Sequence, residues 1–446
     1  MSPATPVRRR RAGLLATLLV ATLVAPPASA GDDFEQAPIR YSATTPDNTV
    51  SRLQERLDAG SETLAWKEGT GWLASVLAAL EVPVSSQTLV FSKTSLQQAR
   101  IGPRNPRALY FNDDVYVGYV RGGDVVELSV ADPLLGTVFY TLDQAPSPAP
   151  RFARRTEDCL LCHGGSQTRG VPGHVIRSVY PAASGQPIFS AGSHRVDDST
   201  ALADRWGGWY VTGRHGGQRH LGNVTYTARP ADAAAIDPAG QNVADLAGRF
   251  GDSGYLAAAS DLVALSVLAH QASAHNVLTR AGFDVRTALH REAALNRDLG
   301  QPAGQRWPST DTVLDASAAA LVDCFLFRHE APLTEGIEGT TGFAVEFAAH
   351  APRDAAGRSL KDLDLSRRLL RHPCSHLVHS ASFAALPPEL HERFWARMDA
   401  VLAPGAPAEG FTHLSADDRR AIRGILAATV PGAPPAWRAD AAPGAE

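Results

Sequence analysis

The chain has 446 residues, of which 44% are hydrophobic and 20% are charged, an ordinary composition for a globular protein. Its formal net charge of −4 argues against nucleic acid and against an anionic membrane surface as partners. Its 4 cysteines exclude a disulfide-dense scaffold, which a chain of this length does not need in order to bury a core.

Residues 1–30 have the three parts of a secretory signal peptide. Four arginines at 8–11 form the basic part, 12–24 the apolar part, and Ala-Ser-Ala at 28–30 a small-residue cleavage site. The apolar run is short for a membrane span, so we expect cleavage near Gly31 and no membrane span afterwards. The sequence therefore predicts a bacterial protein that is periplasmic or secreted.

Helical and then strand patterns follow the leader. Asn48 is the expected N-cap of an amphipathic helix that ends at Gly60, and a second helix is expected over residues 72–80. From residue 108 to residue 142 the hydrophobic period becomes two. A turn at 121–123 joins two expected strands into a hairpin, and 138–142 is a further strand.

The motif Cys159-Leu160-Leu161-Cys162-His163 comes next, and its C-x-x-C-H spacing is the one at which haem is attached covalently. Two thiols at this spacing can each add to one vinyl group of the same haem. The adjacent imidazole of His163 can then serve as the proximal axial ligand of the iron. The chain has no second motif of this kind, so the sequence predicts one haem c.

Two other interpretations of the motif require features that the sequence lacks nearby. A structural zinc site needs a second close pair of ligands, and a thioredoxin-like dithiol needs a βαβ unit rather than the Pro-rich loop at 145–150. The other cysteines, Cys324 and Cys374, lie far downstream. Either a disulfide or two buried thiols is compatible with the sequence.

Five arginines flank the motif. Two interpretations are open: the arginines bind haem propionates or an acidic redox partner, or they form a solvated basic edge. They are Arg151, Arg154, Arg155, Arg169 and Arg177.

Two more hairpins and a helical region are expected downstream. The first hairpin joins 174–180 to 188–191, and the second joins 209–212 to 224–227. Helices are expected at 262–278, 285–299, 313–327, 360–370 and 388–402. We therefore expect N-terminal helices plus a β-rich haem-binding region at 31–230, a mainly helical region at 231–430, and a disordered tail at 431–446.

The distal ligand of the iron stays open. Beyond the leader, the chain has a single methionine, Met398, so a His/Met haem depends on that residue alone. The histidine candidates are His174, His194, His215, His220 and His270. If none of them binds, the site is open or holds water, and an electron carrier becomes a candidate enzyme.

Two further patterns are weaker. Arg286 and His290 share a helix face, which superficially resembles the distal pair of haem peroxidases. His372, His376 and His379 have a spacing that a metal cluster could use, but Pro373 interrupts it, which favours an ordinary helix face.

At the haem motif the chain resembles c-type cytochromes. Residues 106–116 (PRALYFNDDVY) and 205–213 (RWGGWYVTG) also resemble a group of large, exported, single-haem bacterial proteins without an established activity. The resemblance implies haem c on Cys159 and Cys162 with His163 as ligand, and it implies no substrate. The chain departs from small cytochromes in its length, in the β-rich sequence around the motif and in lacking a nearby Met.

Together these patterns predict an α+β protein, with β-hairpins around the haem motif followed by a mainly helical C-terminal half. The predicted function is electron transfer through one covalent haem to a redox partner protein. The alternative is a peroxidase-like haem enzyme with an open distal site that acts on a small oxidant.

Overall fold

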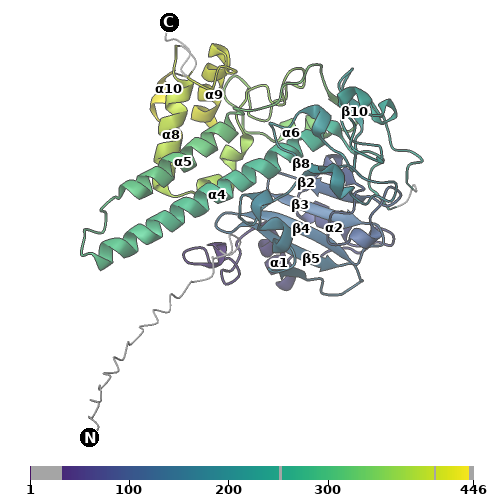
Figure 1. Cartoon of the computed structure of the whole chain (residues 1–446), viewed down its shortest axis with the longest axis horizontal. Helices are drawn as coiled ribbons and strands as arrows, with labels where there is room; N and C mark the ends of the chain where they lie inside the picture. The colour runs from purple at the N-terminus through teal and green to yellow at the C-terminus, as the bar shows by residue number, and fades with distance from the viewer. Residues whose placement is uncertain (2–32, 251–253, 406–407, 441–446) are drawn as a thin grey trace.

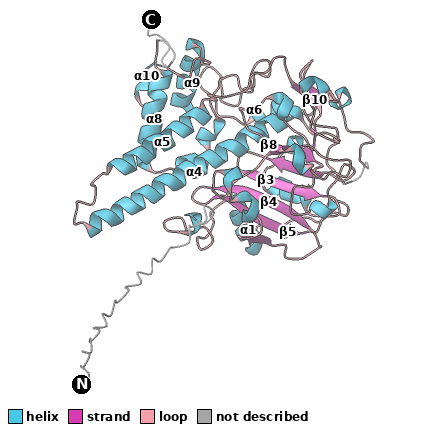
Figure 2. Cartoon of the chain, in the orientation of Figure 1, coloured by secondary structure: helices cyan, strands magenta, loops and turns pink. Residues whose placement is uncertain are grey.

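The computed structural model describes the chain except for residues 2–32, 251–253, 406–407 and 441–446 (Figure 1). The predicted signal peptide and its cleavage site therefore lie outside the described residues. The described part confirms the predicted α+β class, because strands dominate the N-terminal half and helices the C-terminal half (Figure 2).

The largest sheet has seven strands in the order β6-β5-β4-β3-β2-β1-β9, and all its neighbouring strands are antiparallel. Two small sheets pair β7 with β8 and β10 with β11. The strands are β1 Thr88–Val90, β2 Arg107–Phe111, β3 Val115–Val120, β4 Val125–Asp132, β5 Gly136–Asp143, β6 Phe152–Arg155, β7 Arg177–Val179, β8 Ser193–Arg195, β9 Trp209–Tyr210, β10 Gly213–Arg214 and β11 Glu338–Gly339.

Helices form most of the C-terminal half (Figures 1 and 2). The helices are α1 Thr49–Asp58, α2 Leu73–Ala79, α3 Leu160–His163, α4 Leu262–Asp298, α5 Pro308–Phe325, α6 Phe343–Ala349, α7 Ala381–Ala384, α8 Pro388–Leu402, α9 Ala416–Thr429 and α10 Ala436–Asp440. Of these, α5, α8, α9 and α10 lie together to one side of the sheet (Figures 1 and 2).

One face of the sheet packs on the N-terminal helices. The side chain of Asn48 accepts hydrogen bonds from the backbone N–H groups of Val50 and Ser51, so the predicted start of α1 is confirmed. Leu53 of α1 and Val76 of α2 are buried with the alternate strand residues, as the period of two predicts. The predicted hairpin of β3 and β4 is confirmed as well.

Helix α4 is one continuous helix of 37 residues, where the sequence predicted two. Gly282 lies inside the helix without breaking it, because its neighbours supply enough packing. Residues of the first half, such as Leu265, pack with Phe111 of the sheet, whereas residues of the second half, such as Leu278, belong to the core of the C-terminal helices. The helix therefore joins the two halves of the protein.

The two predicted downstream hairpins form differently. In the first, β7 pairs with β8, while residues 189–191 of the predicted return strand form a 3₁₀ turn. The second prediction is wrong, because β9 instead extends the large sheet at β1. The side chain of Asn223 accepts from the N–H of Val211 at 2.8 Å and donates to its carbonyl at 2.7 Å, and so takes the place of a return strand.

Three further expectations for the C-terminal half are corrected. Residues 360–370 are not helical, because the carboxylate of Asp364 caps the backbone of Ser366 and Arg367 in a turn. Helix α9 lies where no helix was predicted. The tail predicted at 431–446 contains α10, whose Trp437 is only 1% exposed and packs in the helical core; residues 441–446 lie outside the described residues.

No helix in the described part of the chain is both long and apolar enough to cross a membrane.

Candidate functional site

The haem motif forms a single helical turn directly after the edge strand β6. Helix α3 contains Leu160 to His163, with Cys159 at its N-terminal end. Leu160 packs against the core under the sheet, while Leu161 is 85% exposed. Both thiols of the motif are free, and that of Cys162 is exposed. The motif is therefore anchored by one leucine, with the Cys162 thiol exposed and Cys159 and His163 half-buried.

The imidazole of His163 is held by the backbone of Gly173. Its Nδ1 lies 2.8 Å from the Gly173 carbonyl oxygen, and the Gly173 N–H donates to the His163 carbonyl at 2.9 Å. Because a carbonyl only accepts, Nδ1 carries the proton, and the lone pair of the neutral ring is on Nε2. Among the described residues, none hydrogen bonds to this Nε2. The ring therefore offers Nε2 as a metal ligand.

Helix α4 fixes the segment that holds His163. The side chain of Asn276 accepts from the N–H of His174 at 2.8 Å and donates to the His174 carbonyl at 2.7 Å. A side chain at Gly173 would collide with Asn276, so only glycine lets the two segments approach this closely. Asn276 is thus a positioning residue: it holds the backbone of His174, and the adjacent Gly173 holds the imidazole of His163.

The imidazole of the motif lies over the face of the sheet opposite α1 and α2, whereas Leu160 packs on the side of these helices. The His163 ring is 5.1 Å from the ring of Phe139 on β5. Burial lowers the pKa of His163, and the hydrogen bond to Gly173 opposes that effect. Burial, together with the charges of Glu127 and Asp158, raises the pKa of the Cys159 thiol to about 11, so this thiol is protonated at neutral pH.

In two of the distal-ligand candidates, a ring nitrogen already accepts a hydrogen bond from the backbone. Nε2 of His215 accepts a hydrogen bond from the backbone N–H of Asn242, and Nδ1 of His220 accepts one from that of Gly222, both at 3.0 Å. The two rings lie 4.8 Å apart. A ring nitrogen that accepts from a backbone amide has no lone pair for iron, so we expect neither residue to bind it.

His174 and His194 are also engaged. The nitrogens of His174 contact the hydroxyls of Ser129 at 3.4 Å and Thr137 at 3.3 Å, and this residue directly follows Gly173 on the Nδ1 side of His163. His174 therefore lies on the side of the His163 ring that faces away from Nε2, the expected iron ligand. Nε2 of His194 contacts the Tyr180 hydroxyl at 3.3 Å.

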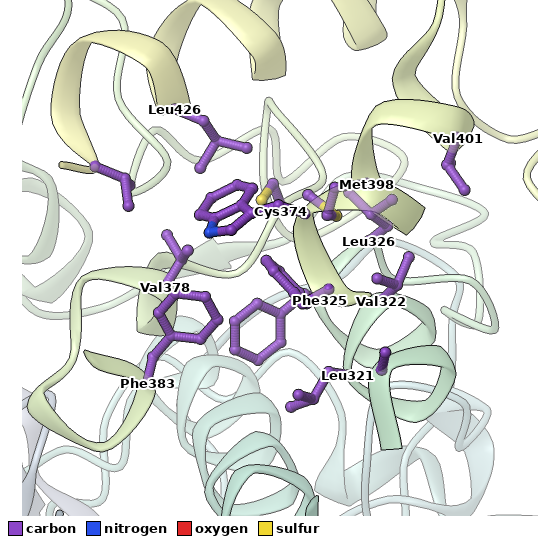
Figure 3. Close-up of a cluster of buried hydrophobic side chains, with 14 of the residues drawn as sticks. Leu321, Val322, Phe325, Leu326, Cys374, Val378, Phe383, Met398, Val401 and Leu426 are labelled. Carbon is purple, nitrogen blue, oxygen red and sulfur yellow. The ribbon is translucent and has the colours of Figure 1, made fainter. Parts of the chain in front are cut away.

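The remaining two candidates lie in packed interiors. His270 is bonded through Nδ1 to Asp198 at 2.9 Å and through Nε2 to Ser375 at 2.8 Å. Met398 of α8 is fully buried among the C-terminal helices, close to Cys374 and Leu326 (Figure 3). The motif packs on the sheet, so the structure does not bring Met398 to the haem motif.

The other histidine and arginine patterns do not form a site. His376 and His379 begin and end a 3₁₀ turn instead of sharing a helix face, and His379 bonds Thr429 at 2.9 Å. Arg286 and His290 do share α4, and Arg286 donates to the carbonyl of Gly282. Within the described ranges, no group of three or more His, Cys, Asp or Glu side chains is arranged to hold a metal ion.

The flanking arginines separate into two groups. Arg154, which donates to the backbone carbonyls of Tyr41 and Thr44, and Arg155 are half-buried, while Arg151, Arg169 and Arg177 are exposed. Arg151 pairs with Asp58 at 3.0 Å. Arg155 extends from β6 onto the sheet face beside the motif, where its Nε donates to the Thr141 hydroxyl at 2.9 Å.

Cys324 and Cys374 are both free, and each has a raised pKa because it is buried. The structure thus favours two buried thiols over a disulfide.

The structure adds residues that the sequence patterns did not single out. Gly173 and Asn276 position His163, and Arg107 and Glu127 form an ion pair on the sheet face beside the motif. Only Arg107 had a signal, since it lies in the stretch 106–116 that carries the resemblance. Asn276 acts through a contact between segments far apart in the chain, and Gly173 is required because Asn276 packs against it.

The donor set at this site fits a covalent haem. Two free thiols on one helical turn, one imidazole with a free Nε2, and neighbouring arginines are the groups that such a cofactor requires. The seven-stranded sheet is antiparallel, so the motif does not open a helix in the βαβ unit of a thioredoxin-like dithiol. Comparisons with models of protein families, with curated proteins and with solved structures found no significant match.

Proposed function

We propose that this chain is an exported c-type haem protein that passes electrons through one covalently attached haem. The observation that carries the proposal is the orientation of His163, whose Nδ1 is fixed on the Gly173 carbonyl at 2.8 Å while Nε2 is left free. Axial histidines commonly have this second hydrogen bond, which sets the tautomer and the direction of the ring.

The motif residues have distinct roles in this proposal. The thiols of Cys159 and Cys162 would each form a thioether, and His163 would bind the iron through Nε2. A haem held there supplies one-electron redox chemistry. The surface position of Cys162 and Leu161 leaves one side of the motif open to solvent, which suits electron exchange with a partner protein.

The proposed location outside the cytoplasm depends on the leader sequence. Residues 1–30 have the organisation of a signal peptide, and c-type haem is attached outside the cytoplasm in bacteria, so leader and motif predict the same compartment. We propose a periplasmic or secreted protein.

The test is covalent haem in the full chain, produced together with a bacterial haem c maturation system. We expect haem staining of the denatured chain with one haem per polypeptide, and none in Cys159→Ala/Cys162→Ala. The matched control is Cys324→Ala, which removes a thiol on α5 and should retain the haem. A wild-type chain without covalent haem would contradict the proposal.

A second function is favoured by the state of the distal candidates. Both ring nitrogens of His174 and His270 and the accepting ring nitrogens of His215 and His220 are engaged within the protein, and Met398 lies in the helical core. These contacts support an iron with an open distal position, able to bind a small oxidant such as peroxide.

Carbon monoxide separates the two functions. If the visible bands of the dithionite-reduced protein shift when carbon monoxide is added, the distal site is open and the enzyme function gains support. If the bands stay in place, two protein ligands hold the iron, and electron transfer is favoured.

A further inference from the structure

A row of polar side chains crosses the sheet beside the haem motif. On β4, Glu127 lies opposite Gly118 of β3 and Thr141 of β5. Arg107 extends from β2 and Arg155 from β6 toward the same row. We call Arg107, Glu127, Thr141 and Arg155 the polar row. Because alternate residues of a strand share one face, all four lie on the face that carries the motif.

The two arginines of the polar row are held by neighbours on the strands. The Arg107 guanidinium forms an ion pair with Glu127, across Gly118. A Cβ atom at Gly118 would collide with that guanidinium, so glycine leaves the space in which the Arg107 side chain lies against β3. Arg155 donates through Nε to Thr141, and Gln97 donates to Glu127 at 3.0 Å. Rigid strands therefore fix the positions of both cations.

The polar row has unused hydrogen-bond donors and an uncompensated charge. Nε of Arg107 is buried without a partner. Among the described residues, none hydrogen bonds to the two terminal nitrogens of Arg155. Two guanidinium groups face one carboxylate, so a single further carboxylate would balance the charge of the row. Arginine is suited to this task, because its planar donors match the two oxygens of a carboxylate.

The polar row is adjacent to the proposed haem ligands. Arg155 lies directly opposite Phe139 in the register of β5 and β6, and the His163 ring packs on Phe139 at 5.1 Å. The charges of Arg155 and Arg107 also act on the Cys159 thiol, where they oppose the effects of burial, Glu127 and Asp158. An anion bound to these arginines would therefore lie beside the motif.

We propose that Arg107 and Arg155 form a binding site for a carboxylate group at the haem motif. The carboxylate has two possible sources, a propionate of the covalently bound haem or a small free carboxylate. The first source rests on the proposed haem function, whereas the second does not. In either case the arginines act as binding residues, and Thr141 and Glu127 position them.

The experiment compares the holoprotein with three variants. Arg155→Leu removes the fork of donors, and Arg155→Lys keeps the charge without the fork. Arg151→Leu is the matched control. It removes the same charge four positions earlier in the chain, but the Arg151 side chain is 67% exposed and paired with Asp58. Two readouts are used: the propionate bending band in resonance Raman spectra, and titration with acetate followed by calorimetry.

If the haem propionate occupies the site, the Raman band shifts in Arg155→Leu, shifts less in Arg155→Lys and stays in place in Arg151→Leu. The midpoint potential of Arg155→Leu should fall, since a cation near the iron favours the less positive reduced state. Covalent haem should persist in all three variants, because the thioethers hold it. Added acetate should have no effect on the wild type.

If a free carboxylate is the ligand, the Raman band stays in place in every variant. Acetate then binds the wild type saturably, and Arg155→Leu weakens that binding about tenfold or more through loss of a charge-assisted hydrogen bond. An unchanged Raman band together with no acetate binding would overturn the proposal. If the wild type contains no covalent haem, the haem function fails separately, and acetate titration of the haem-free chain still tests the site.

Discussion

Asn276 is expected to couple the stability of the protein to the orientation of His163, the proposed haem ligand. The change Asn276→Ala removes both hydrogen bonds to the backbone of His174, at 2.8 and 2.7 Å, and leaves a buried N–H and a buried carbonyl without partners. Each unsatisfied buried group costs about 1–3 kcal/mol, so we expect the free energy of unfolding to fall by about 2–6 kcal/mol. This is a large part of the stability of an ordinary domain.

The same change should alter the environment of the iron. When the backbone at His174 is released, the neighbouring Gly173 carbonyl no longer fixes Nδ1 of His163. We therefore expect the visible spectrum and the midpoint potential of the holoprotein to change. The assays are urea denaturation followed by circular dichroism, and absorption spectroscopy with redox titration below the unfolding transition.

Asn296→Ala is the matched control for this prediction. Asn296 is on the same helix, is 1% exposed, donates to the Gln305 carbonyl at 2.8 Å and accepts from the Trp307 indole at 2.6 Å. It should lose similar stability and keep the wild-type spectrum and potential. If both variants keep the wild-type spectrum and potential, Asn276 does not position His163 and the reasoning is refuted.

Three further predictions concern single side chains. Because Met398 packs in the helical core, Met398→Leu should lower the free energy of unfolding by less than about 1.5 kcal/mol and Met398→Ala by about 2–5 kcal/mol. The haem spectrum should be unchanged in both variants. A spectral change in Met398→Leu would identify Met398 as a ligand. Trp437→Ala should lower the free energy of unfolding by about 3–5 kcal/mol in denaturant titrations, and a negligible loss would show that α10 does not belong to the core. Burial raises the pKa of Glu330 from 4.5 to about 7, which favours its neutral form in the fold, so this contribution is complete below pH 4.5 and is lost as the pH rises through 7. Glu330→Gln should therefore raise the free energy of unfolding at pH 8 by up to about 3 kcal/mol and change it much less at pH 5; an equal change at both pH values would contradict this assignment.

The sequence predicted those elements whose cause is local. The start of α1 follows from the side chain of Asn48, and the hairpin of β3 and β4 follows from alternation around a glycine turn. Long-range partners decide the elements that were missed. Strand β9 pairs with β1, far earlier in the chain, and the Asn223 side chain replaces the expected return strand.

For the candidate site, too, the sequence predicted the residues that are close together in the chain and missed those brought in by the fold. The motif residues are adjacent in the chain, so their spacing alone identifies them. Residues that hold His163 come from α4 and from the loop after the motif, and no periodicity connects Asn276 with Gly173. For His215 and His220 the structure gives a reason against iron binding that a sequence does not reveal, namely a ring nitrogen that already accepts a hydrogen bond.

The single long helix α4 places the parts of the proposed site in a definite order of assembly. The two cysteines of the motif precede Asn276 in the chain, so a growing polypeptide presents Cys159 and Cys162 before it contains the residue that holds the segment after them. Until α4 docks, the loop that follows the motif lacks its buried anchor. We therefore expect the docking of this helix to fix the loop after the motif, and with it the direction of the His163 imidazole, only once the chain has been made well past the two cysteines.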